Sequence, residues 1–228
     1  ASMSHLRDYV DYFTVNISSP NTPGLRELQQ EEVLKNLLTK ISDDNSKSLK
    51  PRPLAVKISP DLSKQEVQSI SRLAVTCGFN GIIGTNTTVN RIGLKTKANR
   101  IKDVGSGGLS GRPLTRHSTD VVAWIKEAVG DSAAVIGVGG IFNAQEVIDK
   151  RNAGENLALV CTSGITDLNS MFRKKGQNAN TLGAGIGNWD TSSNTSMSRI
   201  FANGNFNQAI SNWDTSNVVN TYNAFHRA

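Results

Sequence analysis

The chain has 228 residues, of which 37% are apolar and 19% charged, so it is long enough for one large or two small folded domains. The net charge of +6 is modest for this length and forms no polybasic arm, which argues against a nucleic-acid-binding protein. Cys77 and Cys161 lack CxxC spacing and the three histidines share no motif, so we expect a reducing compartment, no disulfide and no metal site.

Residues 1–164 alternate short apolar, β-branched runs with segments of helical periodicity. This alternation is typical of βα units around a parallel sheet. Capping-box patterns, Ser63 with Glu66 and Asn143 with Glu146, mark the start of two of the helices. The predicted strands are 9–16, 54–58, 81–86, 133–138 and 157–161, and the predicted helices are 31–41, 63–77, 118–129 and 143–154.

Residues 165–228 differ in composition from the first part of the chain. They are rich in asparagine, and "GNWDTS" at 187–192 recurs as "SNWDTS" at 211–216. The spacing from Trp189 to Trp213 and from Phe201 to Phe225 is 24 residues in both cases, which predicts a solenoid-type repeat of about two units. We therefore expect two domains, 1–164 and 165–228.

Polar or glycine residues follow each predicted strand of the first domain. In a parallel βα architecture, functional groups gather at these carboxyl ends. The glycine-rich stretches "GSGGLSGRP" (105–113) and "GVGGI" (137–141) are suited to a phosphate, because glycine lets backbone amides approach phosphate oxygens. The strand ends hold Asn16, Lys57, Asn86, Thr87, the glycines of "GVGG" and Thr162.

Five motifs, "VNISSPNTPGLRELQ", "LAVKISPDL", "GIIGTNTTVNR", "GGLSGRPL" and "IGVGGI", resemble in order and spacing those of the FMN-dependent dihydroorotate dehydrogenases. The likeness is to the class 2 enzymes, which use quinone, and it spans about residues 5–163. It implies a TIM barrel of which this chain holds about five of eight strands. It also implies oxidation of dihydroorotate to orotate in pyrimidine biosynthesis.

The resemblance implies a role for several side chains. Ser19 would be the catalytic base that takes the C5 proton while hydride leaves C6 for the flavin, with Asn21 and Thr22 orienting it. The side chains that would bind substrate are Asn16, Asn21, Thr22, Asn86 and Thr87. Lys57 would stabilise the reduced flavin, and the FMN contacts would be Lys57, Thr85, Gly107, Gly140 and Thr162.

The resemblance also implies that the strands preceding this segment carry further flavin contacts, so a complementing N-terminal barrel half is an expected partner. Residues 165–225 are similar to the Asn-rich repeats of BspA-type bacterial surface proteins. Two interpretations stay open: an oxidoreductase segment of reduced activity by itself, and a non-catalytic fusion or surface interaction protein acting through its repeats.

The class 2 family is associated with the mitochondrial inner membrane or the bacterial cytoplasmic membrane. No apolar run here reaches the roughly 18 residues of a membrane helix, so the chain is expected to be soluble. The basic stretch 91–102 is interpreted as a solvated loop, with a substrate lid or a membrane headgroup contact as the alternatives.

Overall fold

The structure is a computed structural model that describes residues 2–19, 31–154, 165–173, 184–204 and 206–228. The chain forms two compact units, Ala1–Gly139 and Gly140–Ala228.

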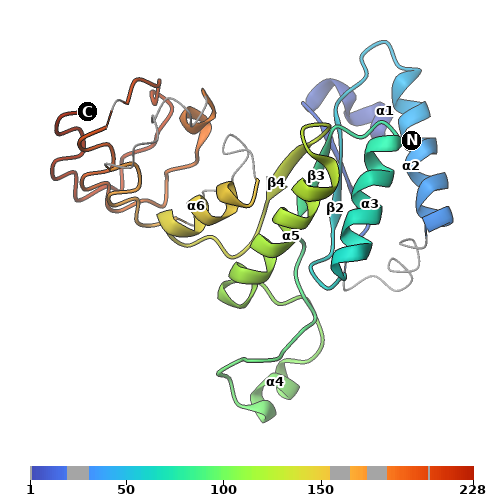
Figure 1. Cartoon of the computed structure of the whole chain (residues 1–228), viewed down its shortest axis with the longest axis horizontal. Coiled ribbons are helices and arrows are strands. Elements are labelled where there is room, and N and C mark those ends of the chain that lie inside the picture. The colour runs from blue at the N-terminus through green and yellow to red at the C-terminus, as the bar shows by residue number, and fades with distance from the viewer. Residues whose placement is uncertain (1, 20–30, 155–164, 174–183, 205) are drawn as a thin grey trace. The chain divides into compact units, whose positions relative to one another are not determined.

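A parallel sheet forms the centre of the first unit (Figure 1). Its strands are β1 (Phe13–Asn16), β2 (Leu54–Ile58), β3 (Gly81–Gly84) and β4 (Ala134–Gly137), and they lie in the order β1-β2-β3-β4. The predicted α/β architecture with βα units is therefore confirmed for these four strands. The fifth predicted strand, 157–161, lies outside the described residues.

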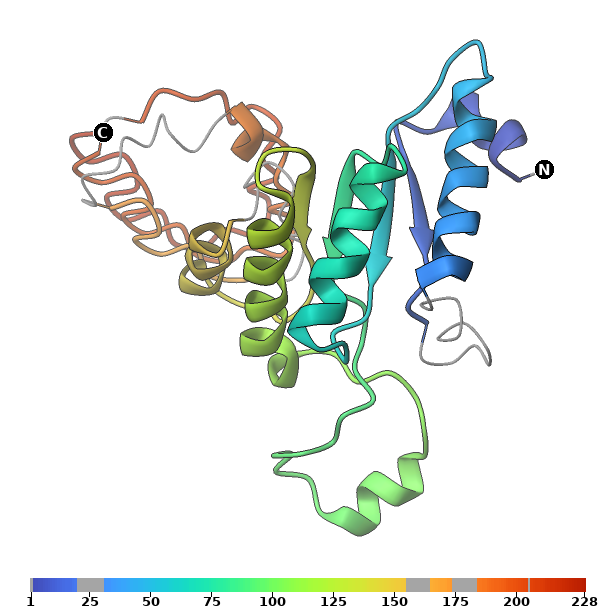
Figure 2. The ribbon, with the colours of Figure 1, turned by 45° about the vertical axis from the view of Figure 1, so that its right-hand side comes forward.

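Three helices cover one face of this sheet: α2 (Glu31–Ser46), α3 (Lys64–Thr76) and α5 (Thr115–Val129) (Figure 2). The predicted capping box at the start of α3 is present, and the pKa of Glu66 is lowered because the hydroxyl and backbone N–H of Ser63 both donate to its carboxylate. Asn143 and Glu146 form the second capping box, at the start of α6 (Ala144–Asn152) in the second unit.

Gly84 shows which face of the sheet the helices cover. A Cβ at this position would lie 2.9 Å from Cδ1 of Ile125 in α5, so the close approach of β3 and α5 requires glycine. Because neighbouring residues of a strand point to opposite faces, Ile83 points away from α5. In the strand register Asn16 stands beside Lys57, and Lys57 beside Ile83. These three side chains therefore share the face opposite the helices.

Several element boundaries differ from the predictions. The strand expected to begin at Tyr9 begins at Phe13, because Arg7–Tyr9 form a 3-10 helix in which the buried Arg7 donates to the backbone and side-chain oxygens of Asn45. The predicted end of α2 was residue 41, but the helix continues for five more residues to Ser46. The Arg7 contact and the hydrogen bonds between Asn45 and Arg52 stabilise this additional part. The short helices α1 (Ser2–Leu6) and α4 (Ala98–Val104) were not expected.

The basic stretch 91–102 extends away from the sheet and carries most of α4 (Figure 1). The apolar side chains Ile92 and Val104 are 89% and 72% exposed, and no ion pair of the described residues involves this stretch. A solvated loop agrees with this exposure, whereas a lid or a headgroup contact stays a prediction.

The second unit contains α6 followed by three stacked coils, defined here as the first coil (165–173), the second coil (189–204) and the third coil (213–228). Parallel bridges join Asp167 to Ser196 and Ser196 to Asn220. Backbone N–H groups of each coil donate to carbonyl groups of the next one. These bonds run from Leu168, Ser170 and Phe172 to Ser196, Ser198 and Ile200, and from Met197, Arg199 and Phe201 to Asn220, Tyr222 and Ala224.

Aromatic side chains stack along the coils, as the 24-residue spacing predicted. The rings of Trp189 and Trp213 lie 6.4 Å apart at 7°, and those of Phe201 and Phe225 lie 5.2 Å apart. Phe172 of the first coil stacks on Phe201 at 5.5 Å. The first coil was not recognised from the sequence because Phe172 and Phe201 are 29 residues apart, which breaks the period of 24.

The Trp-Asp-Thr-Ser motif forms the same turn in both places where it occurs. Asp190 accepts hydrogen bonds from the backbone and hydroxyl of Ser192, and Asp214 accepts one from the backbone of Ser216. Hydrogen bonds from the hydroxyl and the backbone of Ser192 lower the pKa of Asp190, and those from the hydroxyl and the backbone of Ser216 lower the pKa of Asp214. Because the carboxyl pKa is lower in the folded protein, the ionised carboxylate stabilises the turn at pH values above the ordinary pKa of Asp. This stabilisation is lost as the pH falls through the pKa of the folded state.

Composition and packing divide the chain at different places. The change in composition predicts a boundary at Gly164, whereas the compact units divide between Gly139 and Gly140. Ile141 and Val147, which precede the predicted boundary, belong to the same buried cluster as Ile165 and Leu168. The 164/165 boundary itself stays a prediction, since residues 155–164 lie outside the described residues.

Asn194 interrupts the apolar column of the coils. It is fully buried, and among the described residues neither its Nδ2 nor its Oδ1 has a hydrogen-bond partner. From the spacings between coils, the equivalent positions are Ile165 and Val218, and both pack in the apolar cluster. A buried amide without partners costs free energy, because its bonds to water are lost and not replaced.

We therefore expect Asn194→Val to stabilise the coils by about 1–3 kcal/mol, since it removes the unpaired amide and keeps a similar volume. Hydrogen exchange at the bonded amides of Met197, Arg199 and Phe201 should slow accordingly. The matched control is Asn188→Val, because Asn188 is exposed and its replacement should leave these rates unchanged. Faster exchange in Asn194→Val than in the parent would contradict this prediction.

Candidate functional site

The candidate site lies at the carboxyl end of the sheet, where three side chains from two segments of the chain meet. The hydroxyl of Ser18 donates to Oδ1 of Asn16 at 2.8 Å, and Nδ2 of Asn86 donates to Oγ of Ser18 at 3.2 Å. Asn86 also approaches Oδ1 of Asn16 at 3.5 Å. Because β2 lies between β1 and β3, this network connects two loops across the end of the intervening strand.

The backbone around the network fixes where Asn86 points. Its N–H donates to the carbonyl of Ile58 at 3.0 Å, and its own Oδ1 accepts from the backbone of Thr87 at 2.9 Å. Thr85 is 2% exposed, and its N–H donates to the carbonyl of Val138 beyond β4. The segment 85–87 is thus held from both sides of β3, and the peptide bond between Gly84 and Thr85 is cis.

Lys57 is the cationic group beside the network. It stands next to Asn16 in the strand register, on the sheet face opposite the helices, and it is half-buried. Within the part of the chain that the structure describes, no hydrogen bond or ion pair involves its Nζ, and the amide nitrogen of Asn16 likewise has no partner. The two groups offer unused hydrogen-bond donors to a polar or anionic ligand.

Asp61 fixes the loop after Asn86. Its carboxylate accepts from the hydroxyl of Thr88 and, at 3.0 Å, from the backbone of Val89. Thr88 in turn pairs with Leu109 through two backbone hydrogen bonds, and the Arg91 guanidinium donates to the carbonyl of Gly107. The glycine-rich segment 105–111 is therefore tied to the loop that carries Asn86 and Thr87.

The sequence-predicted residues fall into three groups. Asn16, Lys57, Thr85, Asn86 and Thr87 come together at this end of the sheet, and Ser19 directly follows the network residue Ser18 and is half-buried. Gly107 is connected through the Thr88–Leu109 pair, whereas Gly140, with a φ of 70°, belongs to the second unit. Asn21, Thr22 and Thr162 lie outside the described residues.

Ser18, Asp61 and Thr88 organise the site but were not singled out from the sequence. A signal existed for each, because Ser18 adjoins Ser19, Asp61 follows the strand end of "LAVKISPD", and Thr88 follows Asn86 and Thr87. Within the described segments, no group of three or more His, Cys, Asp or Glu side chains is placed to hold a metal ion. No described helix is long and apolar enough to cross a bilayer.

Comparison with known proteins decides the family. The sequence model of the family described as "Dihydroorotate dehydrogenase" matches residues 1–175. The chain belongs to the dihydroorotate dehydrogenase family. A second model, described as "Mycoplasma protein of unknown function, DUF285", matches residues 140–228. The two family matches therefore overlap in 140–175, the region that contains α6 and the first coil.

Relatives within the dihydroorotate dehydrogenase family carry the name "Dihydroorotate dehydrogenase (quinone)". The chain is 46% identical over 153 residues to the one from Nocardioides sp., covering 67% of this chain and 43% of the relative. It is 41% identical over 182 residues to the one from Christiangramia forsetii, covering 77% and 52%. The chain thus spans about half the length of these curated relatives.

Solved structures of the dihydroorotate dehydrogenase family show the same fold. The crystal structure of DHODH from Eimeria tenella in complex with ferulenol matches with a TM-score of 0.62 and 31% identity, covering 70% of this chain and 46% of that one. The ligand-free structure from the same organism also matches with a TM-score of 0.62 and 31% identity. The four-stranded parallel sheet is therefore part of a TIM barrel of this family.

The Asp61 contacts give a prediction about the site loop. Asp61→Ala removes charge-assisted hydrogen bonds worth about 1.5–3 kcal/mol, so exchange at the Thr88 and Leu109 amides should accelerate by roughly tenfold or more. Asp103→Ala, in the exposed helix α4, is the control and should change neither rate. Unchanged exchange in Asp61→Ala would show that the Thr88–Leu109 pair holds the loop by itself.

Proposed function

We propose that residues 1–164 form the substrate-binding and base-carrying part of an FMN-dependent dihydroorotate dehydrogenase that passes electrons to quinone. The observation that carries this proposal is the Asn16–Ser18–Asn86 network beside Lys57. Membership of the family supports it, as does the printed name of the relatives.

The network suits a planar ligand that alternates hydrogen-bond donors and acceptors, as a pyrimidine ring does. A carboxamide presents both kinds of group, and here the two asparagines are oriented by Ser18 and by the backbone of Thr87. Hydrogen bonds in such a chain polarise one another. We therefore assign Asn16, Asn86 and Thr87 to substrate, together with Asn21 and Thr22 of the adjoining loop.

Ser19 is proposed as the general base. A serine hydroxyl is a weak base, so it acts only when neighbouring groups orient it and accept the proton onward. The hydrogen bonds of Ser18 fix the backbone immediately before Ser19, which supports a place for Ser19 next to the proposed substrate site. Asn21 and Thr22 would further orient the hydroxyl of Ser19.

The residues of the first unit fit one side of a flavin. Lys57 has no partner for its charge among the described residues, and it lies on the open face where an anionic ring edge would be stabilised. Gly107, with a φ of 154°, lies in the glycine-rich segment tied to Thr88. FMN, when bound, would accept the hydride from substrate. Thr85, Gly140 and Thr162 complete the proposed contacts.

FMN binding tests the proposed division of the barrel. Because the chain covers about half of its relatives, we expect residues 1–228 to bind FMN weakly. Adding the N-terminal half of the Nocardioides relative should strengthen binding at least tenfold. Quenching of flavin fluorescence measures both, and equally tight binding without the added half would refute the need for complementation.

The Ser19 assignment is tested in the complemented protein. Ser19→Ala should slow flavin reduction by dihydroorotate by roughly 10²- to 10⁴-fold, the range for loss of a positioned general base, while FMN affinity stays the same. Anaerobic stopped-flow absorbance measures the rate. The control is Ser48→Ala, because Ser48 lies outside the proposed site between α2 and β2. Equal rates in Ser19→Ala and the parent would remove Ser19 from the mechanism.

A second candidate function uses residues 165–228 as an interaction module of the BspA-like type. The observation that favours it is the apolar cluster of the coils, which is built from the second unit's own residues. A colourless protein that binds a surface ligand through the coils would support this function over the first.

A further inference from the structure

Arg91 lies at the start of the basic stretch and joins two segments of the backbone. Its Nη2 donates to the carbonyl of Gly107 at 2.5 Å, and its Nη1 donates to the carbonyls of Thr88 and Asn90 at 3.3 and 3.4 Å. The side chain is half-buried, and no carboxylate of the described residues forms an ion pair with it. The guanidinium group therefore binds backbone carbonyls and keeps its charge unneutralised.

The bond from Arg91 to Gly107 determines where the next backbone amide points. The peptide between Gly107 and Gly108 is trans, since the cis peptide bond of the described residues is the one between Gly84 and Thr85. In a trans peptide the carbonyl and the following N–H point in opposite directions. The Gly108 N–H therefore points away from Arg91, and no hydrogen bond among the described residues uses it.

A fixed and unused N–H of this kind suits a phosphate oxygen. Two successive glycines leave the approach to the amide open, because neither carries a Cβ. The charged donor on the Gly107 carbonyl polarises the peptide, which makes the Gly108 N–H a stronger donor. The guanidinium charge also favours an anion nearby. The Gly107–Gly108 peptide thus combines orientation, access and charge.

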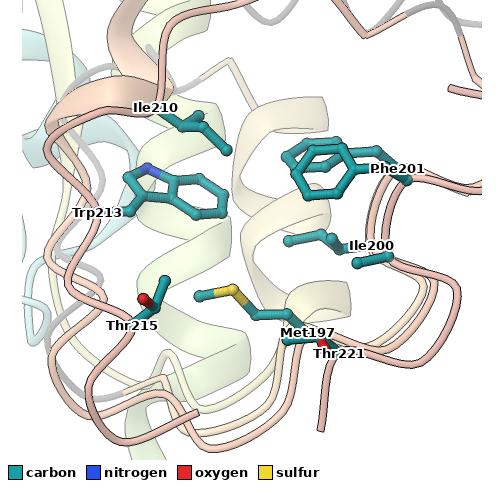
Figure 3. Close-up of a pocket in the computed structure, with 9 residues that line it drawn as sticks. Met197, Ile200, Phe201, Ile210, Trp213, Thr215 and Thr221 are labelled. Carbon is teal, nitrogen blue, oxygen red and sulfur yellow. The ribbon is translucent and has the colours of Figure 1, made fainter.

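The cavity within the coils of the second unit lacks this combination. It has a volume of about 440 Å³, and in Figure 3 the side chains of Trp213 and Ile210 face those of Phe201 and Met197 across it. No charged side chain of the described residues lines this cavity. Its lining suits apolar groups, so a phosphate is better placed at the Gly107–Gly108 peptide.

We propose that Arg91 is a positioning residue for phosphate binding: by holding the Gly107 carbonyl, it directs the Gly108 N–H to the phosphate group of FMN. The inference rests on the proposed function, in which Gly107 contacts FMN, and adds Arg91 and Gly108 to that site. Lysine is no substitute for Arg91, because an ammonium group lacks the planar fork that reaches Gly107 and Thr88 together.

A comparison of FMN with riboflavin, which lacks the phosphate, tests this role. Quenching of flavin fluorescence measures both affinities in the full chain complemented with the N-terminal half of the Nocardioides relative. Arg91→Lys should weaken FMN binding by roughly tenfold, the factor for one hydrogen bond to a charged group, and leave riboflavin binding unchanged. Arg100→Lys makes the same change at an exposed position of α4 and should alter neither affinity.

Inorganic phosphate provides a test that needs no flavin. In NMR spectra of the full chain alone, phosphate should move the Gly108 amide proton downfield in the parent and in Arg100→Lys, but not in Arg91→Lys. If this holds while neither flavin binds, the proposed function fails and the role of Arg91 stands. An equal loss of FMN and riboflavin affinity in Arg91→Lys would overturn the proposal. So would a Gly108 amide that phosphate leaves unmoved in the parent, or moves equally in Arg91→Lys.

Discussion

The strand register of the parallel sheet is the constraint on which the candidate site depends. It places Asn16 beside Lys57 and turns both side chains away from the helices. Since α3 and α5 cover the other face, polar groups on this face do not disturb the core. Moving β1 by one residue would replace Asn16 with Val15 at the site and bury an amide against the helices. Packing on one face therefore determines the chemistry available on the other.

Secondary structure up to the end of α6 followed closely from local sequence signals. The two capping boxes lie where Ser63 and Asn143 predicted them, because a cap depends on residues only three positions apart. The start of β1 could not be predicted in this way. It depends on hydrogen bonds between Arg7 and two residues far along the chain, Asn45 and Arg52. The apolar residues near Tyr9 do not indicate that contact.

The site was predictable in its residue types but not in its connections. Asn16, Lys57 and Asn86 were recognisable as polar residues at strand ends, whereas Ser18 gained its role only because the fold brings Asn86 to its hydroxyl. The coils show the reverse limitation. The period of 24 identified Trp189 and Trp213 as equivalent residues. The first coil could not be recognised in the same way because its spacing is irregular, and only the backbone hydrogen bond from Phe172 to Ile200 shows how it aligns with the second coil.

The place of α6 affects how the chain should be divided for expression. Its Val147, with the preceding Ile141, is buried in the cluster of the coils, although the dihydroorotate dehydrogenase match continues through this helix. A fragment ending at Gly164 would keep α6 and lose the coil side chains that cover it, which would expose apolar surface to solvent. A fragment ending at Gly139 leaves out both α6 and the coils. The boundary between the compact units should therefore give a more soluble fragment than the boundary at Gly164.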